Sequence, residues 1–413
     1  MGRCTPRFTL LLGCGLAAAG LVQGCRDDTG PPAADDTEGI AEAQGPLNPA
    51  LVAEGRQIFR FDTYDNETFW TDSLELHEVI QASVTPEAAL GLGLKVDVDA
   101  LPPEVIAGII DESIPLDEPA TTVALLKLGA VLGVVGTVDE ADNLTSVGIT
   151  CALCHSTVDN SFIDGIGHRL DGWPNRDLDV GKIVTLSESD DLDPFRDVYN
   201  GWGPGLYDPR FNQDEQNHPV VIPPAFGLRH VAKEIYTGDD VVSYWNLYVA
   251  VTQMHGHGTF VDDRIGVSIS NPPDRVSSKL DALRAYQFSL TTPPPQPGSY
   301  DVAAAQRGKA VFNGAAKCQE CHRGSTYTDI NSGELHDPDE VGQDAAYALR
   351  SATKQYRTTP LRGLWNPPQL DGPYFHDGSA ATLPDVVEHY VAVFGLTLTE
   401  QQKSDLVEYL KSL

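Results

Sequence analysis

Two short segments of this sequence share one pattern: Cys151-Ala-Leu-Cys154-His155 and Cys318-Gln-Glu-Cys321-His322. In each segment two cysteines are separated by two residues, and a histidine follows directly. This pattern is the attachment signature of c-type haem, because two thiols at this spacing can add to the two vinyl groups of one porphyrin. The histidine then lies under the iron as its proximal ligand.

Two other uses of paired cysteines fit the pattern less well. A zinc ribbon places its C-x-x-C pairs roughly 15–20 residues apart and needs no histidine after both, whereas these pairs are far more widely separated. A thioredoxin-like redox pair lies in a βαβ pattern, which this sequence does not show. The sequence therefore predicts a dihaem c-type cytochrome with two covalently bound haem c groups, in which His155 and His322 are the proximal iron ligands.

The composition limits the class of partner. The chain has 413 residues, 41% of them hydrophobic, which is enough for two or three domains with separate cores. Its formal net charge of −31 repels nucleic acid and would attract a basic redox protein, although the same charge also serves solubility alone. The cysteines outside the two motifs are Cys4, Cys14 and Cys25, near the N-terminus, so none remains for a structural disulfide.

The N-terminus predicts export. Arg3 and Arg7 precede an apolar stretch, residues 8–22, that is too short to span a bilayer comfortably, as in a secretion signal. Residues 1–25 end in Gly24-Cys25, which resembles the lipoprotein pattern in which Cys25 becomes the lipidated first residue. Simple cleavage and an uncleaved anchor remain open. Residues 26–46 predict an acidic disordered tether, so we expect a lipid-anchored protein on the periplasmic or cell-surface side of a bacterial membrane.

The rest of the chain is expected to be mostly α, with two cytochrome c-like haem domains. We predict a helical N-terminal extension over 47–146, a first haem domain over 147–290, a Pro-rich linker over 291–299 and a second cytochrome c domain over 300–413. Helices are expected over 50–61, 86–94, 119–132, 302–312 and 383–394. Thr399 and Gln402 form a capping box that opens a terminal helix.

The first haem domain offers several candidate distal-pocket groups. A Gly-rich loop after the first motif carries His168, a candidate distal iron ligand of the first haem. Further on, Met254, His255 and His257 lie on a loop flanked by glycines, and they are candidate catalytic groups of the same pocket. Met254 is the only methionine that remains once the leader is removed, and ordinary core packing is the other interpretation of it.

The helix expected over 383–394 separates two candidate ligands of the second haem. Its apolar residues recur at i, i+3, i+4, i+7, i+8 and i+11, and Tyr390 lies on that stripe. His389 is turned about 100° away. Tyr390 is therefore the candidate distal iron ligand of the second haem, and a tyrosine buried beside the porphyrin and bonded elsewhere is the alternative.

Two further stretches, Tyr356-Arg-Thr-Thr-Pro-Leu-Arg362 and Gly372-Pro-Tyr-Phe-His376-Asp-Gly378, give the chain a family resemblance. Together with the two C-x-x-C-H segments, they resemble the bacterial dihaem cytochrome c peroxidase and MauG-type family. The resemblance is specific over 303–413, fair over 147–177, loose over 178–302 and absent before that. It also supports the two-domain, mostly helical fold.

The resemblance implies roles for individual residues. Tyr390 lies fourteen residues after His376, where this family has the distal ligand of the second haem, and His376 itself is expected to contribute to cofactor binding. His168 resembles the histidine that caps the first haem and leaves on activation. Arg362 is expected to pair with a haem propionate. Calcium binding is expected at Asn175, Asp371 and Pro373. The chain lacks the Asn-Pro-x-Glu-Met segment that carries the peroxidases' catalytic glutamate.

Three functions follow as hypotheses. The first is a haem-dependent oxidoreductase of the cytochrome c peroxidase type, which reduces hydrogen peroxide or dioxygen at the first haem with electrons passed through the second. Trp173, Trp202 and Trp245 are candidate bridges between the haems. The second is a non-catalytic electron-transfer cytochrome with both irons six-coordinate. The third is a haem-based sensor, which would need a partner domain that the sequence does not show.

Overall fold

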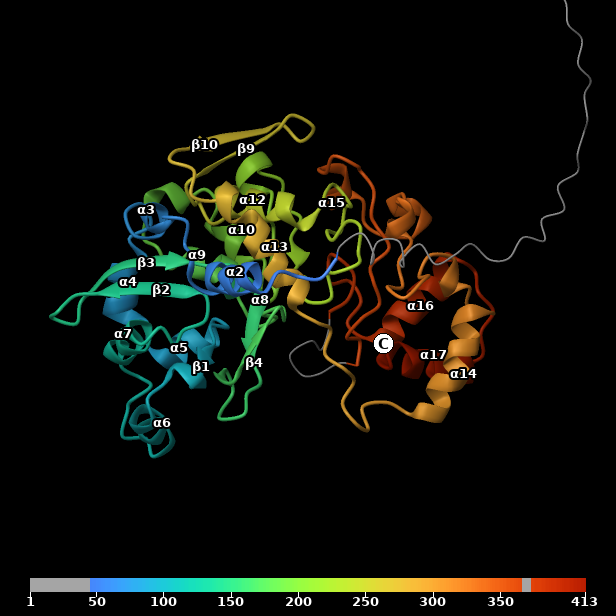
Figure 1. The fold of residues 1–413 in the computed structure, drawn as a ribbon, viewed down its shortest axis with the longest axis horizontal. Coiled ribbons are helices and arrows are strands. Elements are labelled where there is room, and N and C mark those ends of the chain that lie inside the picture. Colours follow the sequence, from blue (N-terminus) through green and yellow to red (C-terminus); the bar gives the residue numbers. More distant parts are fainter. Residues whose placement is uncertain (1–44, 366–372) are drawn as a thin grey trace, which may run out of the picture. The chain divides into compact units, whose positions relative to one another are not determined.

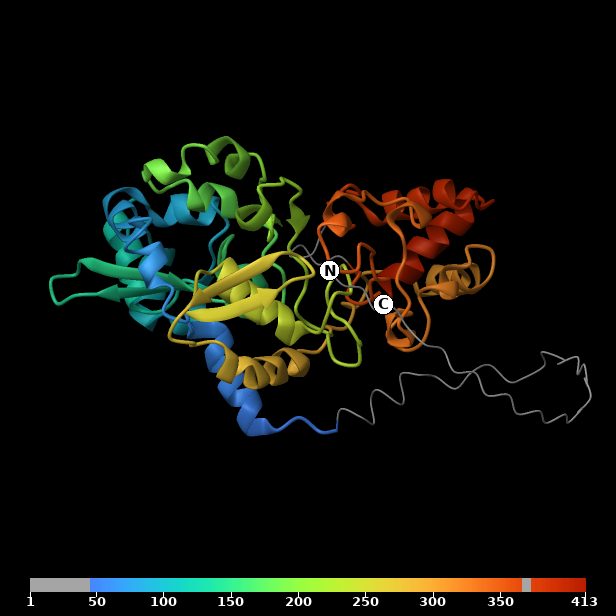
Figure 2. The same ribbon diagram turned by 90° about the horizontal axis from the view of Figure 1, so that it is seen from above.

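The computed structural model describes residues 45–365 and 373–413, all of which belong to one compact unit (Figures 1 and 2). The predicted signal 1–25, the predicted tether up to residue 44 and Asp371 lie outside the described residues. Within them the chain is mostly helical, as the sequence predicts, and its strands pair in two-stranded sheets. No helix in the described part of the chain combines the length and the hydropathy needed to cross a bilayer.

The bounds of the elements are as follows. The α-helices up to residue 214 are α2 (Pro49–Phe61), α3 (Glu67–Trp70), α4 (Leu76–Ser83), α5 (Pro86–Gly91), α6 (Pro103–Ile110), α7 (Pro119–Lys127), α8 (Ala152–His155), α9 (Val180–Val184), α10 (Arg196–Asn200) and α11 (Phe211–Asp214). Those that follow are α12 (Val242–Thr252), α13 (Leu280–Ser289), α14 (Val302–Asn313), α15 (Ala346–Leu349), α16 (Leu383–Val393) and α17 (Glu400–Lys411). The strands are β1 (Val96–Asp97), β2 (Val134–Val138), β3 (Leu144–Ile149), β4 (Ser156–Val158), β5 (Ile166–Gly167), β6 (Arg169–Asp171), β7 (Leu206–Tyr207), β8 (Val220–Val221), β9 (Gly258–Asp262) and β10 (Val267–Asn271).

Helix α2 begins the described fold and packs along α13 (Figure 2). Asn48 caps α2, since its Oδ1 accepts a hydrogen bond from the Ala50 amide at 3.0 Å, and Pro49 occupies the first turn, where its missing N–H costs nothing. A Cβ on Gly55 would lie 1.9 Å from the Ala282 carbonyl oxygen. Glycine is therefore required at 55 for the two helices to approach this closely.

The segment 47–146 is less helical than the sequence predicts. Strands β2 and β3 form an antiparallel hairpin in which Val134 pairs with Ile149 and Thr137 with Ser146. Residues 134–138 are mostly β-branched, which favours strands, whereas the apolar content alone had suggested helix. The predicted helix 119–132 ends as α7 at Lys127. One apolar core combines side chains of α7 and β1 with side chains of this hairpin.

The C-terminal part contains α14, α16 and α17 (Figure 1). The predicted capping box is confirmed, because Thr399 Oγ1 accepts from the Gln402 amide while the Gln402 side chain accepts from the Thr399 amide. Gly308 of α14 allows the crossing with α17, since a Cβ there would lie 1.9 Å from the Asp405 carbonyl oxygen. The three helices enclose one apolar core, and Cys318 of the second cysteine motif packs against it.

Candidate haem sites

The first cysteine motif forms the one-turn helix α8 and its N-cap. The orientation of the His155 ring is fixed, because its Nδ1 lies 3.1 Å from the Pro223 carbonyl oxygen. Burial lowers the pKa of His155 to about 4, so the ring is neutral and its Nδ1–H donates to that carbonyl. Its Nε2 is then an unprotonated nitrogen with a lone pair, which is the form that binds iron.

The second motif has the same arrangement on a different local structure, a 3₁₀ turn over Cys318–Glu320. The His322 Nδ1 lies 3.0 Å from the Tyr327 carbonyl oxygen, and its backbone amide donates to the Cys318 carbonyl at 2.8 Å. Burial lowers the pKa of His322, so this ring too is held neutral, with Nε2 available. None of the four motif cysteines forms a disulfide. Free thiols beside a fixed neutral imidazole fit covalent haem.

A buried arginine next to the first motif gives a second test of whether these residues suit a bound haem. The Asn175 amide donates to the Cys154 carbonyl at 2.9 Å, and Arg176 follows directly. Two nitrogens of Arg176, Nε and Nη1, are buried and have no hydrogen-bond partner among the described residues. A guanidinium left this way is costly unless an anion pairs with it. A haem propionate supplies that anion.

Helix α16 turns Tyr390 and His389 in different directions, as the periodicity predicts. Burial first, and then the neighbouring Cys318 and Cys321 thiols, raise the pKa of Tyr390 to about 12, so its hydroxyl lies near the second motif. The His389 Nε2 instead lies 3.0 Å from the Val341 carbonyl oxygen. The structure therefore brings Tyr390 to the second haem site and keeps His389 away from it. Iron ligation by Tyr390 stays a prediction.

His168 is not brought to the first motif. Its side chain is 53% exposed, and its Nδ1 lies 3.0 Å from Asp99 Oδ1. The hydrogen bond with Asp99 raises the pKa of His168, which favours a surface ion pair. The sequence could not reveal this, because Asp99 lies far from His168 in the chain and meets it only through the parallel pairing of β1 with β5.

The Met254-His-Gly-His257 loop lies beside the first motif without a clear iron ligand. Met254 is buried in the core cluster that contacts Cys151, which agrees with the core-packing interpretation. His255 stacks on Phe69 at 3.6 Å between ring centroids, and burial lowers its pKa to about 4. The His257 Nε2 lies 3.4 Å from Thr68 Oγ1.

Tyr64 is the residue that sequence reasoning missed. It is 1% exposed, its φ is +55°, and its hydroxyl is buried without a hydrogen-bond partner among the described residues. Burial and then the Cys151 thiol raise its pKa well above the ordinary value, so the phenol lies at the first motif. A positive φ is unusual for an aromatic residue and persists only where the surroundings impose it.

The contacts that hold Tyr64 come from the same loop as the candidate histidines. The His257 amide donates to the Tyr64 carbonyl at 2.8 Å, and a Cβ on Gly256 would lie 2.7 Å from the Tyr64 Cβ. The Lys279 ammonium lies 5.0 Å from the centre of the Tyr64 ring. Gly256 of that loop therefore allows close packing on Tyr64. Nothing in the local sequence around residue 64 signals this.

The other residues that the resemblance singled out lie as follows. The His376 Nε2 and the Tyr356 hydroxyl are 2.9 Å apart, and His376 also stacks on Tyr347. The Arg362 Nη1 donates to the Gly227 carbonyl at 2.7 Å. The Asn175 Nδ2 donates to the Gly93 carbonyl at 2.8 Å, whereas its Oδ1 is buried without a donor among the described residues.

The predicted tryptophan bridges occupy three separate surroundings. Trp173 meets Trp365, a residue the sequence had not suggested, with ring centroids 6.3 Å apart. The Trp202 Nε1 donates to Asn217 Oδ1 at 2.8 Å. The Arg210 guanidinium lies over the Trp245 ring, 5.3 Å from the ring centre. Of the three, only Trp173 is packed against an indole from the C-terminal part.

Two further ionisable side chains, Glu234 and His336, have raised pKa values. Burial raises the pKa of Glu234 to about 7, and its Oε2 accepts from the Val242 amide at 2.8 Å. His336 lies between Asp329 at 3.0 Å and Glu340 at 3.1 Å. Hydrogen bonds with Asp329 first, then with the Cys321 thiol and Glu340, raise the pKa of His336 to about 11. His336 is therefore an imidazolium that pairs with two carboxylates beside the second cysteine motif.

Comparison with known proteins agrees with this geometry. The cytochrome c family model matches residues 305–413. The methylamine utilization protein MauG of Methylorubrum extorquens is 31% identical over 129 residues, which cover 27% of this chain and 35% of MauG. The cytochrome-c peroxidase IdrP1 of Denitromonas iodatirespirans is 30% identical over 152 residues, which cover 27% of this chain and 40% of that protein. A structure of Kuenenia stuttgartiensis hydrazine synthase covers 55% of this chain and 81% of its own, at 20% identity and a TM-score of 0.36.

Residues 305–413 therefore form a cytochrome c domain, the class of domain that binds haem c. Parts of the chain are similar to MauG and to a cytochrome-c peroxidase, at 30–31% identity. The chain matches well under half the length of these two curated relatives.

Proposed function

We propose that this chain is an exported dihaem cytochrome c that acts as an oxidoreductase of the cytochrome c peroxidase and MauG type. It reduces hydrogen peroxide or dioxygen at the first haem, with electrons that pass through the second. The observation that carries the proposal is the presentation of two neutral proximal imidazoles, His155 and His322, each fixed through Nδ1 by a backbone carbonyl.

The side chains available as second iron ligands favour an enzyme over a carrier. Methionine ligation raises the potential of a haem and suits electron transfer. The one methionine of the described chain, Met254, is buried in a core cluster. Tyr390 instead directs a phenol at the second site, and an oxygen donor stabilises ferric iron. A chain that only relayed electrons would have no use for this arrangement.

When bound, haem c supplies reversible electron transfer and reactivity toward peroxide or dioxygen. The residues of this chain bind and orient it. The four motif thiols would attach it, Arg176 and Arg362 would pair with its propionates, and the Tyr64 hydroxyl lies at the first attachment segment. The Trp173–Trp365 contact offers a route for electrons between the two parts. Short edge-to-face contacts of this kind exclude water along the route.

Calcium, location and partner belong to the same proposal. The buried Asn175 Oδ1 without a donor suits a cation, and Asp371 and the Pro373 carbonyl would complete the site. Cys25 would carry the lipid that anchors the protein on the periplasmic or cell-surface side. The net charge of −31 fits a basic electron-transfer protein as partner.

The deciding experiment is optical and low-temperature EPR spectroscopy of the lipid-free holoprotein, before and after hydrogen peroxide, with the haem count fixed by intact mass. We expect two haems, a high-spin ferric signal that hydrogen peroxide removes, and a low-spin signal without a methionine–iron band. Two low-spin haems that do not react with hydrogen peroxide, in the oxidised and the half-reduced protein, would establish the electron carrier instead.

A further inference from the structure

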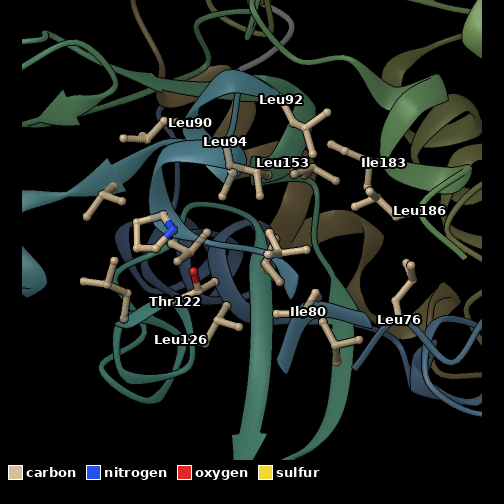
Figure 3. A pocket seen from close by; sticks show the side chains of 18 of the residues that line it. Leu76, Ile80, Leu90, Leu92, Leu94, Thr122, Leu126, Leu153, Ile183 and Leu186 are labelled. Atoms are coloured by element: carbon tan, nitrogen blue, oxygen red, sulfur yellow. The ribbon is translucent and has the colours of Figure 1, made fainter. Parts of the chain in front are cut away.

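An apolar cavity lies in the N-terminal part of the described chain, which the proposed function does not use (Figure 3). Its volume is about 70 Å³. Helices α4, α5 and α7 and the β2–β3 hairpin surround it, and the first cysteine motif closes one side. The side chains that matter here are Ala89, Thr122, Leu126, Val134, Ile149 and Leu153.

The walls offer almost nothing to a polar molecule. Every accessible wall atom is carbon, and Thr122 carries the one hydroxyl among the lining side chains. The Thr122 Oγ1 is buried and has no hydrogen-bond partner among the described residues. A trapped water needs two to four polar partners. The cavity is roomy enough for water but too apolar to hold it.

The cavity is built against the first haem-attachment segment. Leu153 is the residue between Ala152 and Cys154, and its side chain lies on the cavity wall (Figure 3). Gly133 has φ +74°, and a Cβ there would lie 2.1 Å from the Leu153 amide nitrogen. Because glycine allows this contact, Val134 and Leu153 form adjoining parts of one wall. A molecule in the cavity would therefore lie against Leu153, inside the first C-x-x-C-H segment.

Size and chemistry together define the ligand. An engineered apolar cavity of about 150 Å³ binds benzene or xenon, and this one is about half that volume. It suits a neutral apolar molecule of a few atoms. Dioxygen meets this requirement, because it needs no hydrogen-bond donor or acceptor. Hydrogen peroxide does not, because its two O–H groups would be buried without acceptors.

We propose that this cavity is a binding site for dioxygen that feeds the first haem. This rests on the proposed oxidoreductase function and deepens it, since it selects dioxygen over hydrogen peroxide as the molecule stored next to the site. The N-terminal part then has a role: it builds an apolar compartment onto the attachment segment.

The test uses holoprotein crystals pressurised with xenon and, separately, with dioxygen. The Ala89→Leu variant adds three carbons to the cavity wall, and Ala88→Leu makes the same change on the exposed face of the same helix as the matched control. We expect xenon and dioxygen density in the cavity of the wild type and of A88L, and none in A89L. Ordered water there, or no gas in the wild type, overturns the site.

The link to the first haem is tested separately by the reoxidation of dithionite-reduced protein. A89L should slow reoxidation by dioxygen severalfold relative to A88L and leave the reaction with hydrogen peroxide unchanged. Equal rates in A89L and A88L, or equal slowing with both oxidants, contradict a role in supply. If the first haem reacts with neither oxidant, the proposed function fails while gas density still reports on the site, so the two failures are distinguishable.

Discussion

Trp173 and Trp365 meet edge to face, with ring centroids 6.3 Å apart and ring planes at 82°. Trp173 lies two residues before Asn175, whose amide is bonded to the first cysteine motif, and Trp365 lies in the C-terminal part beyond Arg362. Phe226 packs against Trp173 and completes a buried cluster of three aromatic side chains. This contact joins the part that carries the first cysteine motif to the C-terminal part through π-systems.

Replacing Trp365 by phenylalanine should slow electron exchange between the haems. The smaller ring opens the contact with Trp173 and leaves a cavity, at a cost of about 1–2 kcal/mol in the free energy of unfolding. Rapid-mixing reduction that monitors both haems measures the exchange. Trp202→Phe is the comparison, because Trp202 lies in a different aromatic cluster. If W202F slows the exchange and W365F does not, Trp202 is the better bridge.

Replacing Tyr390 by phenylalanine should change the low-spin ferric spectrum of the second haem. Burial raises the pKa of Tyr390 to about 12 in the protein alone, and bound ferric iron would favour its phenolate. Loss of the hydroxyl removes the oxygen donor and leaves the ring packing on Phe394 in place. EPR and optical spectra are the readout. His389→Asn on the same helix is the control, and equal changes in both variants would mean that the helix has moved.

What the sequence could predict was local chemistry. The cysteine motifs and the direction of Tyr390 on α16 follow from residue spacing within a few turns. The position of Tyr64 does not, because its positive φ is imposed by a loop near residue 257. The Asp99 contact of His168 and the Trp365 contact of Trp173 likewise depend on packing between distant segments. The cavity behind Leu153 arises from shapes of apolar side chains, which carry no sequence pattern.

Glu234 should make the protein less stable as pH rises through neutrality. Burial raises its pKa from 4.5 to about 7, so between these values the folded state holds a proton that the unfolded state has released. Its contribution to stability is complete below about pH 4.5 and is lost as pH rises through about 7, which amounts to about 3 kcal/mol. Denaturant unfolding of Glu234→Gln should lack this decline. An identical pH profile in wild type and E234Q would contradict the assignment.

Thr122→Val should raise the free energy of unfolding by about 1 kcal/mol, because it removes a buried hydroxyl that has no partner. Thr71→Val is the contrast. The Thr71 Oγ1 donates to the Val147 carbonyl and accepts from the Val147 amide, both at 2.8 Å, so its loss should cost about 2 kcal/mol. Guanidinium unfolding measures both. Destabilisation by T122V would mean that the hydroxyl has a partner in solution.

Tyr64→Phe should alter the first haem without weakening the fold. The hydroxyl is buried beside the Cys151 thiol and has no stronger partner among the described residues, so its removal should leave the free energy of unfolding unchanged or raise it by up to about 1 kcal/mol. The phenol lies at Cys151, so the optical and EPR spectra of the first haem, and the pH dependence of its ferric form, should shift. Tyr248→Phe is the matched control, because that buried hydroxyl already donates to the Pro209 carbonyl at 2.8 Å. Y248F should lower stability by about 1 kcal/mol and leave the spectra alone. Spectra of Y64F that match the wild type would place the Tyr64 hydroxyl away from the first haem and limit this residue to packing.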